Sequence, residues 1–124
     1  MGGLKTHRDL EVWKKSLDFV VELYGITRTF PKEELYGLTS QIRRSAVSIP
    51  SNIAEGSARN HDNENIQFLY IALGSATEIE TQIIIATRIG YINEETSEKL
   101  LTKINGISKM LQGLLKSIKQ KTHH

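Results

Sequence analysis

The sequence LTSQIRRSAVSIPSNIAEGSAR, residues 38–59, decides the fold of this chain. Read at about 100° per residue, it places aliphatic residues along one helical stripe and small polar residues along a second stripe beside it. Pro50 lies in its middle, where it removes a backbone hydrogen bond and costs about 3 kcal/mol unless packing compensates. The pattern predicts a central bundle helix that is kinked at Pro50. Its aliphatic stripe consists of Leu38, Ile42, Ala46, Ile49 and Ile53.

Three further helices are predicted around this one. The first ends at about Thr27, the third spans about residues 63–89, and the fourth opens at Asn93. Because the connections between helices are short, consecutive helices should pack antiparallel, which predicts an all-α, up-down-up-down four-helix bundle. We expect a single domain over residues 1–124, with a core of about residues 6–120 and with termini that are either disordered or tag-derived.

Composition narrows the class of protein. The chain has 124 residues and no cysteine, and its formal net charge is only +2. The lack of cysteine excludes disulfides, thiolate zinc sites and cysteine nucleophiles, and it fits a reducing compartment, so we expect a cytoplasmic protein. We find no secretory signal and no apolar run that reaches the length of a membrane span, so no membrane partner is expected.

Charge is distributed unevenly along the chain. Acidic residues dominate residues 62–98, whereas residues 99–124 carry lysines and no acid. Such a polarity favours attraction between neighbouring elements or copies. The lysine-rich end is compatible with two interpretations, a solvated segment that keeps the protein soluble and a surface that meets phosphates.

The first helix is apolar around most of its circumference. Three large apolar residues lie beside its expected core stripe and toward the back of the helix. The stripe consists of Leu10, Trp13, Leu17, Val20, Val21 and Tyr24. A helix buried over so much of its surface needs more than one neighbour. We therefore assign these three residues to an interface between copies of the chain: Val12, Phe19 and Leu23.

The third helix has two apolar faces. The first face, which includes Ile79 and Ile83, should lie in the core. A second apolar face has no use in an isolated four-helix bundle, so it predicts an interface between copies at which a glycine allows close packing. The residues assigned to this second face are Ile71, Gly74, Ile85 and Ile89.

Glu80 falls within the core stripe predicted for the third helix. An ionised carboxylate in a core is costly unless it is paired, so we predict a structural ion pair with Arg43, or failing that with Arg44. Acid–base catalysis would need companion groups around a pocket, and no second carboxylate, histidine or nucleophile stands at a useful spacing. Residues 61–64, His-Asp-Asn-Glu, repeat no established ligand spacing. We therefore expect no enzyme activity, no cofactor and no metal site.

Several motifs carry a resemblance that covers nearly the whole chain: WKKS at 13–16, FPKEE at 30–34, YGLTSQIRR at 36–44, SIPSNIAEG at 48–56 and GSATEIETQ at 74–82. Through them the sequence resembles the bacterial four-helix-bundle proteins encoded in intervening sequences of 23S ribosomal RNA genes. The resemblance implies a toroidal homopentamer of four-helix bundles without known catalysis. More distantly, the chain is similar to the accessory protein of diversity-generating retroelements, which implies a nucleic-acid-processing partner such as a reverse transcriptase.

Two functions remain open. In the first, a ring presents a repeated basic surface to ribosomal or other structured RNA, and binding weakens steeply with salt because each neutralised phosphate releases counterions. No aromatic-basic ribonucleoprotein motif occurs, so base-specific recognition is not expected. In the second, the ring is a scaffold that recruits another protein and touches no nucleic acid. The residues assigned to the basic surface are Lys14, Lys15, Arg43, Arg44 and Arg59, together with the C-terminal lysines.

Overall fold

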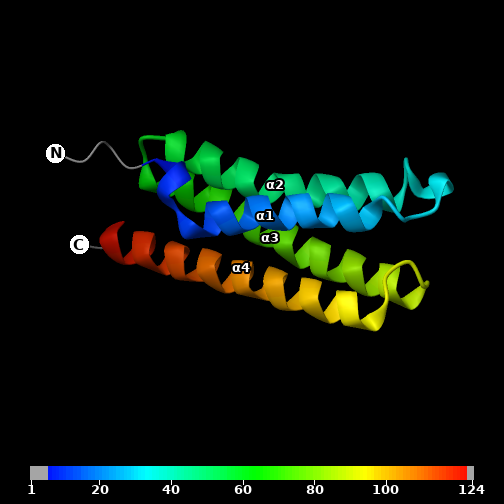
Figure 1. Cartoon of the computed structure of the whole chain (residues 1–124). Helices are drawn as coiled ribbons and strands as arrows, with labels where there is room; N and C mark the ends of the chain where they lie inside the picture. The colour runs from blue at the N-terminus through cyan, green and yellow to red at the C-terminus, as the bar shows by residue number, and fades with distance from the viewer. Residues whose placement is uncertain (1–5, 123–124) are drawn as a thin grey trace.

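The computed structural model describes residues 6–122, which form four α-helices joined by short connections (Figure 1). Two 3-10 turns precede α1 and α2, and no β-strand occurs within the described range. The all-α class is therefore confirmed. The predicted end of the first helix, the bounds of the second and third helices and the start of the fourth lie within one residue of the observed ones. The elements are η1 His7–Asp9, α1 Glu11–Thr27, η2 Lys32–Glu34, α2 Leu38–Ala58, α3 Asp62–Arg88 and α4 Glu94–Thr122.

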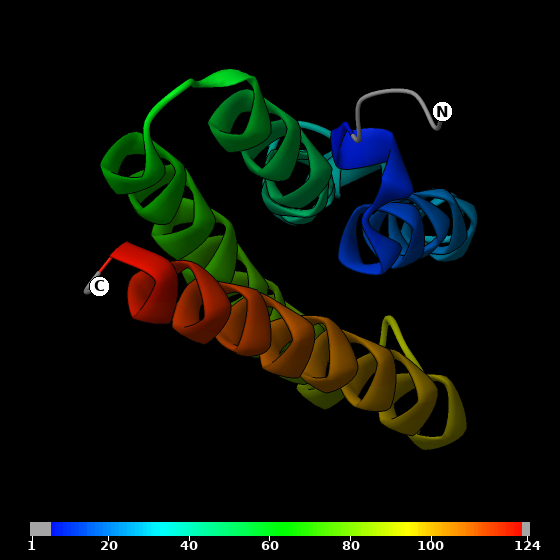
Figure 2. The same ribbon diagram turned by 90° about the vertical axis from the view of Figure 1, so that its left-hand side faces the viewer.

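Consecutive helices run in opposite directions, as the colours of Figure 1 show, so the bundle has the up-down-up-down arrangement. The start of α1, the turn between α2 and α3, and the end of α4 lie at one end of the molecule. Figure 2 shows α2 between α1 and α3, with α4 beside α3. Each of the four helices packs against two others, so the central position expected for α2 stays a prediction.

Local contacts explain where α2 begins and how it packs. Glu34 Oε1 accepts a hydrogen bond from the backbone N–H of Leu38 (3.2 Å), which satisfies one of the free donors of the first turn. The helix continues without a break through Pro50, which is buried, and the bend expected there stays a prediction. On the α3 side, Ser75 Oγ lies 2.8 Å from Ser48 Oγ in a hydrogen bond. Small polar side chains thus join the two helices.

The core face of α1 differs from the predicted one. Val12, Phe19 and Leu23 are at most 4% exposed and lie in the core of the protomer, so their assignment to an interface between copies is wrong. Residues of the predicted core stripe instead face outward: Val21 is 74% exposed and Tyr24 is 37% exposed. The helix is rotated about its axis relative to the prediction, and it turns a different apolar surface to solvent.

Two hydroxyl side chains explain this rotation. Ser16 and Thr27 share the core face of α1 and are almost fully buried. The Ser16 hydroxyl donates to the carbonyl of Trp13 (2.8 Å), and the Thr27 hydroxyl donates to the carbonyl of Leu23 (2.9 Å). Because each hydroxyl is satisfied within its own helix, burying it costs little. The core face therefore includes two positions that the sequence pattern counts as polar.

The seam between α1 and α4 is more open than the others. An open groove runs along it, lined by residues that include Asp18, Thr102 and Gly106. Across the seam, Lys103 Nζ lies 2.6 Å from Glu22 Oε1, and the lysine side chain is more than half exposed. One exposed ion pair is typically worth no more than about 1 kcal/mol. Because α1 and α4 are also the least closely packed pair of neighbouring helices, this seam contributes less to stability than the seams that α2 and α3 form.

The end opposite the termini is closed by contacts between the two connecting segments. The Tyr91 hydroxyl donates to Glu34 Oε2 (2.8 Å), and its ring lies 5.3 Å from that of the buried Phe30. The hydrogen bond to the Glu34 carboxylate, followed by burial and by the negative charges of Glu34 and Glu33, raises the pKa of Tyr91 above its usual value of 10.0. Gly90, with φ of +87°, ends α3 in the left-handed region that favours glycine.

α3 is as long as predicted and more apolar overall than sequence analysis recognised. By length and composition alone, it is the one helix among the described residues that could cross a membrane, whereas sequence analysis found no apolar run of that length. The core helix of a soluble protein passes the same test. In this structure one face of α3, which includes Leu69, Ile79 and Ile83, is buried against the rest of the bundle.

Candidate functional site

A stripe of apolar residues lies exposed on the outer face of α3. Ile71, Ile85 and Ile89 have exposed fractions of 51%, 45% and 52%. A methyl group added at Gly74 would meet no atom within 4 Å, so this glycine serves no close approach inside the protomer. Ile71, Glu78 and Ile85 stand seven residues apart, which is nearly two helical turns, so they share one face. We call this surface the α3 stripe: Ile71, Gly74, Glu78, Ile85 and Ile89.

The orientation of α3 follows from its other side. Ala76, Ile79 and Ile83 are at most 1% exposed and fill the core, and the bond from Ser75 to Ser48 fixes the flank that faces α2. These contacts leave the α3 stripe outward. The structure therefore places the four interface residues predicted on α3 together on one exposed surface, although it contains no second copy that tests their role.

A second apolar surface follows the outer seam between α1 and α2. Trp13 and Leu17 line a hollow near one end of the seam, Tyr24 and Tyr36 line another nearer the opposite end, and Val47 lines both. Leu17, Tyr24 and Val47 are 37–40% exposed and Tyr36 is 94% exposed. We call the surface formed by these five residues, with Arg43 and Arg44 beside them, the α1–α2 groove.

Two guanidinium groups give this groove a positive charge. The guanidinium carbon of Arg43 lies 4.6 Å from the ring centre of Tyr24, and its Nε donates to Thr27 Oγ1 (2.8 Å). Arg44 is exposed and lines the same hollow. Among the described residues, no carboxylate forms an ion pair with either arginine. The groove therefore offers apolar area beside positive charge that the protomer leaves uncompensated.

The predicted ion pair between Arg43 and Glu80 does not form. Glu80 is exposed rather than buried, and no ion pair joins it to any residue between 6 and 122. Arg43 points to the α1 side of α2, where it contacts Tyr24 and Thr27, whereas α3 packs on another side of α2. Glu80 stands at the edge of the core face of α3, so it needs no buried partner. The prediction was wrong because Glu80 was counted as part of the core face of this helix, whereas it lies at the edge of that face.

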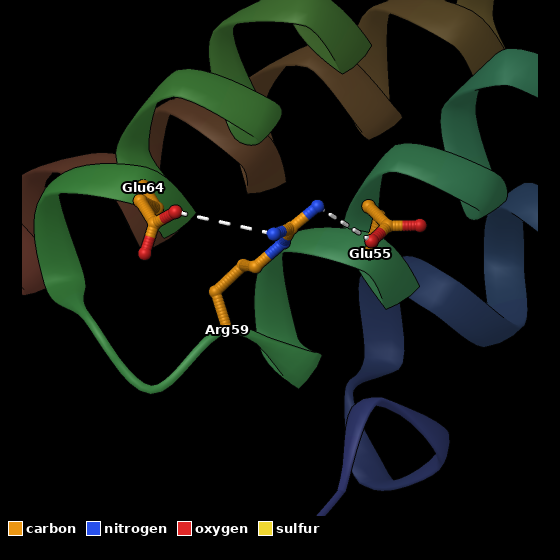
Figure 3. Close-up of polar contacts among 3 residues, drawn as sticks. All are labelled: Glu55, Arg59 and Glu64. Atoms are coloured by element: carbon orange, nitrogen blue, oxygen red, sulfur yellow. Dashed lines mark hydrogen bonds and ion pairs between the residues drawn. The ribbon is translucent and has the colours of Figure 1, made fainter.

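Arg59, assigned to the basic surface, is held by two acids at the turn between α2 and α3 (Figure 3). Its Nη2 lies 3.1 Å from Glu55 and its Nη1 lies 4.0 Å from Glu64, while the guanidinium stacks over Phe68 at 5.2 Å. The helices α2 and α3 also approach each other closely at Gly56, because a methyl group there would lie 2.5 Å from Asn65 Oδ1. Arg59 thus fastens the corner between two helices, and its charge is largely neutralised.

The other predicted cations do not gather around Arg59. Lys14 lies 3.7 Å from Glu11 on its own helix, and Lys15 lines the groove between α1 and α4. Arg43 and Arg44 lie in the α1–α2 groove instead. The five residues therefore occupy several surfaces of one protomer. The sequence could show that they are basic, but it could not show which of them faces an acid.

The α1–α2 groove is the surface that sequence analysis missed. Leu17 and Tyr24 had been placed in the core because they belong to a regular apolar stripe of α1. Tyr36 and Val47 gave a weaker signal, because both are large apolar residues that lie off the predicted stripes. Within residues 6–122, no group of three or more His, Asp or Glu is arranged to hold a metal ion. The two apolar surfaces are therefore the strongest candidates for a functional site.

Comparison with known proteins identifies the family of this bundle. The family described as 23S rRNA-intervening sequence protein matches residues 8–113, which is most of the chain. The chain belongs to this family. A crystal structure of a protein of unknown function from the S23 ribosomal protein family of Bacteroides thetaiotaomicron VPI-5482 is similar, with a TM-score of 0.79 and 31% sequence identity. The similarity covers 85% of this chain and 95% of that one. No curated protein matches the chain.

Proposed function

We propose that this member of the 23S rRNA-intervening sequence family is a non-catalytic, cytoplasmic assembly protein that acts as a ring of five copies. The observation that carries the proposal is the α3 stripe, in which three isoleucines are about half exposed around a glycine where an added methyl group would enter open space. The ring shape and the number of copies are what the family resemblance implies. In this proposal the ring, rather than the single chain, presents the surface that other molecules bind.

The energetic support comes from apolar area. Fully burying an isoleucine side chain is worth about 1.5–3 kcal/mol, so covering the exposed half of each one gives about 1 kcal/mol. The α3 stripe repeats this gain three times, and a ring repeats it at every contact between copies. Large exposed apolar patches of this kind typically mark protein–protein contacts in soluble proteins.

A measurement of mass tests the assembly. Native mass spectrometry or sedimentation equilibrium at micromolar concentration should give five times the 14.0 kDa of one chain. The variant Ile71→Lys/Ile85→Lys should be a folded monomer, because each lysine would have to lose its hydration in the contact. Glu80→Lys, on the same helix but outside the α3 stripe, is the matched control and should keep the assembly. A monomeric natural protein would overturn the proposal.

Association with structured RNA is a second candidate, and the charge of α4 favours it. Glu94, Glu95 and Glu98 lie in the first turns of this helix, whereas residues 99–122 carry lysines and no acid. The lysine-rich end of α4 lies at the end of the bundle that also holds the start of α1 (Figure 1). If copies stand side by side in the same direction, these lysines form one repeated basic rim that phosphates can meet. In this candidate function, the rim holds RNA for a partner protein that processes nucleic acid.

Salt and charge reversal test the RNA candidate. Retention of a labelled structured RNA should fall steeply between about 50 and about 200 mM salt, as expected when several phosphates are neutralised. Lys109→Glu/Lys116→Glu should abolish retention without changing the mass of the assembly. Lys99→Glu, at the acidic end of the same helix, is the control and should leave retention nearly unchanged. If natural protein retains no RNA at low salt, the ring acts as a scaffold for another protein.

A further inference from the structure

We infer that the α1–α2 groove of one copy receives the α3 stripe of the next copy, so that the contact joins two different surfaces and Glu78 meets Arg44. This inference rests on the proposed assembly and names the two surfaces that form it. Three observations support it: the surfaces lie on different flanks of the protomer, their charges are complementary, and their residues stand at matching heights along the bundle.

The positions of the two surfaces favour a contact between unlike patches. The α1–α2 groove follows one flank of α2, and the α3 stripe lies beyond the other flank, as the order α1, α2, α3 in Figure 2 shows. If each patch met a copy of itself, the products would be two unrelated twofold dimers, and either dimer would leave the other patch exposed. Pairing the groove with the stripe covers both patches with one repeated contact, and such a contact closes a ring when the rotation between copies divides a full turn.

The charges of the two surfaces are opposite and uncompensated. Glu78 is the one acid of the α3 stripe, and among residues 6–122 it forms no ion pair. Arg44 is exposed in the groove and forms no ion pair with any acid of the described chain, and Arg43 beside it contacts the Thr27 hydroxyl and the Tyr24 ring. Placing a carboxylate between two isoleucines costs little if a guanidinium covers it, because Arg binds carboxylates with two parallel hydrogen bonds.

The heights of these residues match as well. The hydrogen bond between Ser48 and Ser75 sets those two residues level across antiparallel helices. Counted at 1.5 Å per residue in opposite directions from this point, Glu78 is level with Ser45, which is the neighbour of Arg44. In the same count, Ile71 is level with residue 52, near the hollow lined by Trp13 and Pro50. Rotation about an axis along the bundle preserves height, so Glu78 of one copy arrives at the level of Arg44 of the next.

Mixing two blocked variants distinguishes this pairing from the alternatives. Ile71→Lys/Ile85→Lys keeps the groove, and Leu17→Glu/Val47→Glu keeps the stripe; all four positions are exposed by more than a third, so both variants should fold. Each variant alone should be a monomer, and an equimolar mixture should give a dimer with one chain of each kind. Assembly of either variant alone would show that a patch pairs with itself and would overturn the inference.

A charge exchange provides a second measurement that does not depend on forming an open dimer. Arg44→Glu and Glu78→Arg should each raise the concentration of half-assembly by about tenfold or more, because each brings like charges together. Arg44→Glu/Glu78→Arg should restore assembly to within about threefold of the natural protein, whereas Arg44→Glu/Glu80→Arg, the matched control, should not. Circular dichroism of each variant checks that the helices remain.

The outcomes separate this inference from the proposed assembly. If the natural protein is a monomer, the proposed function itself fails. If the natural protein assembles but the mixed variants remain monomeric and the charge exchange restores nothing, the assembly stands and the pairing of groove with stripe is wrong. If Glu78→Arg restores the assembly of Arg44→Glu and Glu80→Arg does not, the contact of Arg44 is with the α3 stripe, and the effect is not one of overall net charge.

Discussion

The two faces of α3 carry the same residue type in very different surroundings. Ile79 and Ile83 are fully buried on the inner face, whereas Ile85 and Ile89 are about half exposed on the outer face. Neither the composition nor the helical propensity of α3 separates the two groups. What separates them is the position of α2 and α4, which cover only one side of the helix. Isoleucines of the inner face should therefore determine the stability of the protomer, and those of the outer face the stability of contacts between copies.

The largest expected effect comes from truncating an isoleucine on each face. Ile79→Ala should lower the free energy of unfolding by about 2–5 kcal/mol, because it removes buried apolar area and leaves a cavity. Ile85→Ala should change the free energy of unfolding of the protomer by no more than about 0.5 kcal/mol. Urea denaturation, carried out in the background Leu17→Glu/Val47→Glu, which is expected to be monomeric, measures both. Equal losses for the two variants would show that the faces are not different.

The two glycines near these faces should respond in opposite directions. A methyl group at Gly56 would lie 2.5 Å from Asn65 Oδ1 and 3.0 Å from Phe68 Cβ, whereas at Gly74 it would enter open space. Gly74→Ala should stabilise the protomer by up to about 1 kcal/mol through helix propensity. Because both glycines are helical, the gain in helix propensity is shared by Gly56→Ala and Gly74→Ala. The difference between their free energies of unfolding therefore reports mainly the overpacking at Gly56, expected at about 1–3 kcal/mol.

The same monomeric background and the same urea titration serve this pair. The contrast requires Gly56→Ala to be the less stable of the two variants. A Gly56→Ala protein as stable as Gly74→Ala would mean that Asn65 moves aside freely, and that the approach of α2 to the start of α3 is looser than the contacts indicate.

The smallest effect concerns a polar contact that lies outside both faces. The hydrogen bond from Tyr91 to Glu34 favours the neutral phenol and raises the pKa of Tyr91. The contribution of this bond is fully present below the unfolded pKa of about 10, and it is lost as the pH rises through the higher folded pKa. Tyr91→Phe should therefore lower Tm slightly at neutral pH, and the difference should shrink above about pH 10. Thermal denaturation of both proteins over this range measures it.

Sequence analysis predicted the fold well and the surfaces only in part. The helix boundaries follow from local signals, such as the Asn93 side chain that accepts from the N–H of Thr96 and Gly90 at the end of α3. The face of α3 was readable because most of its buried residues are apolar, the exceptions being Ser75 and Gln82. The face of α1 was not, because Ser16 and Thr27 satisfy their hydroxyls within the helix and take core positions.

The charged residues show a different limit. Whether Arg59 is available to a partner depends on Glu55 and Glu64, which stand on either side of a turn, and no pattern along the sequence specifies that geometry. Glu80 presents the reverse case, since a few tens of degrees of helix rotation decide whether a residue at the edge of a stripe needs a partner. Periodicity predicts which residues share a face, but the neighbouring helices decide which face is covered.

The open seam between α1 and α4 has a mechanical consequence for any ring built from these bundles. Each subunit consists of two helical hairpins, α1–α2 and α3–α4. The hairpins pack closely along the seam between α2 and α3, and they are joined more loosely along the seam between α1 and α4, where Lys103 pairs with Glu22. Bending strain that arises during closure will collect where the stiffness is lowest. The flexibility of such a ring then lies within each subunit, so the curvature of the ring adjusts while the contacts between subunits keep their geometry.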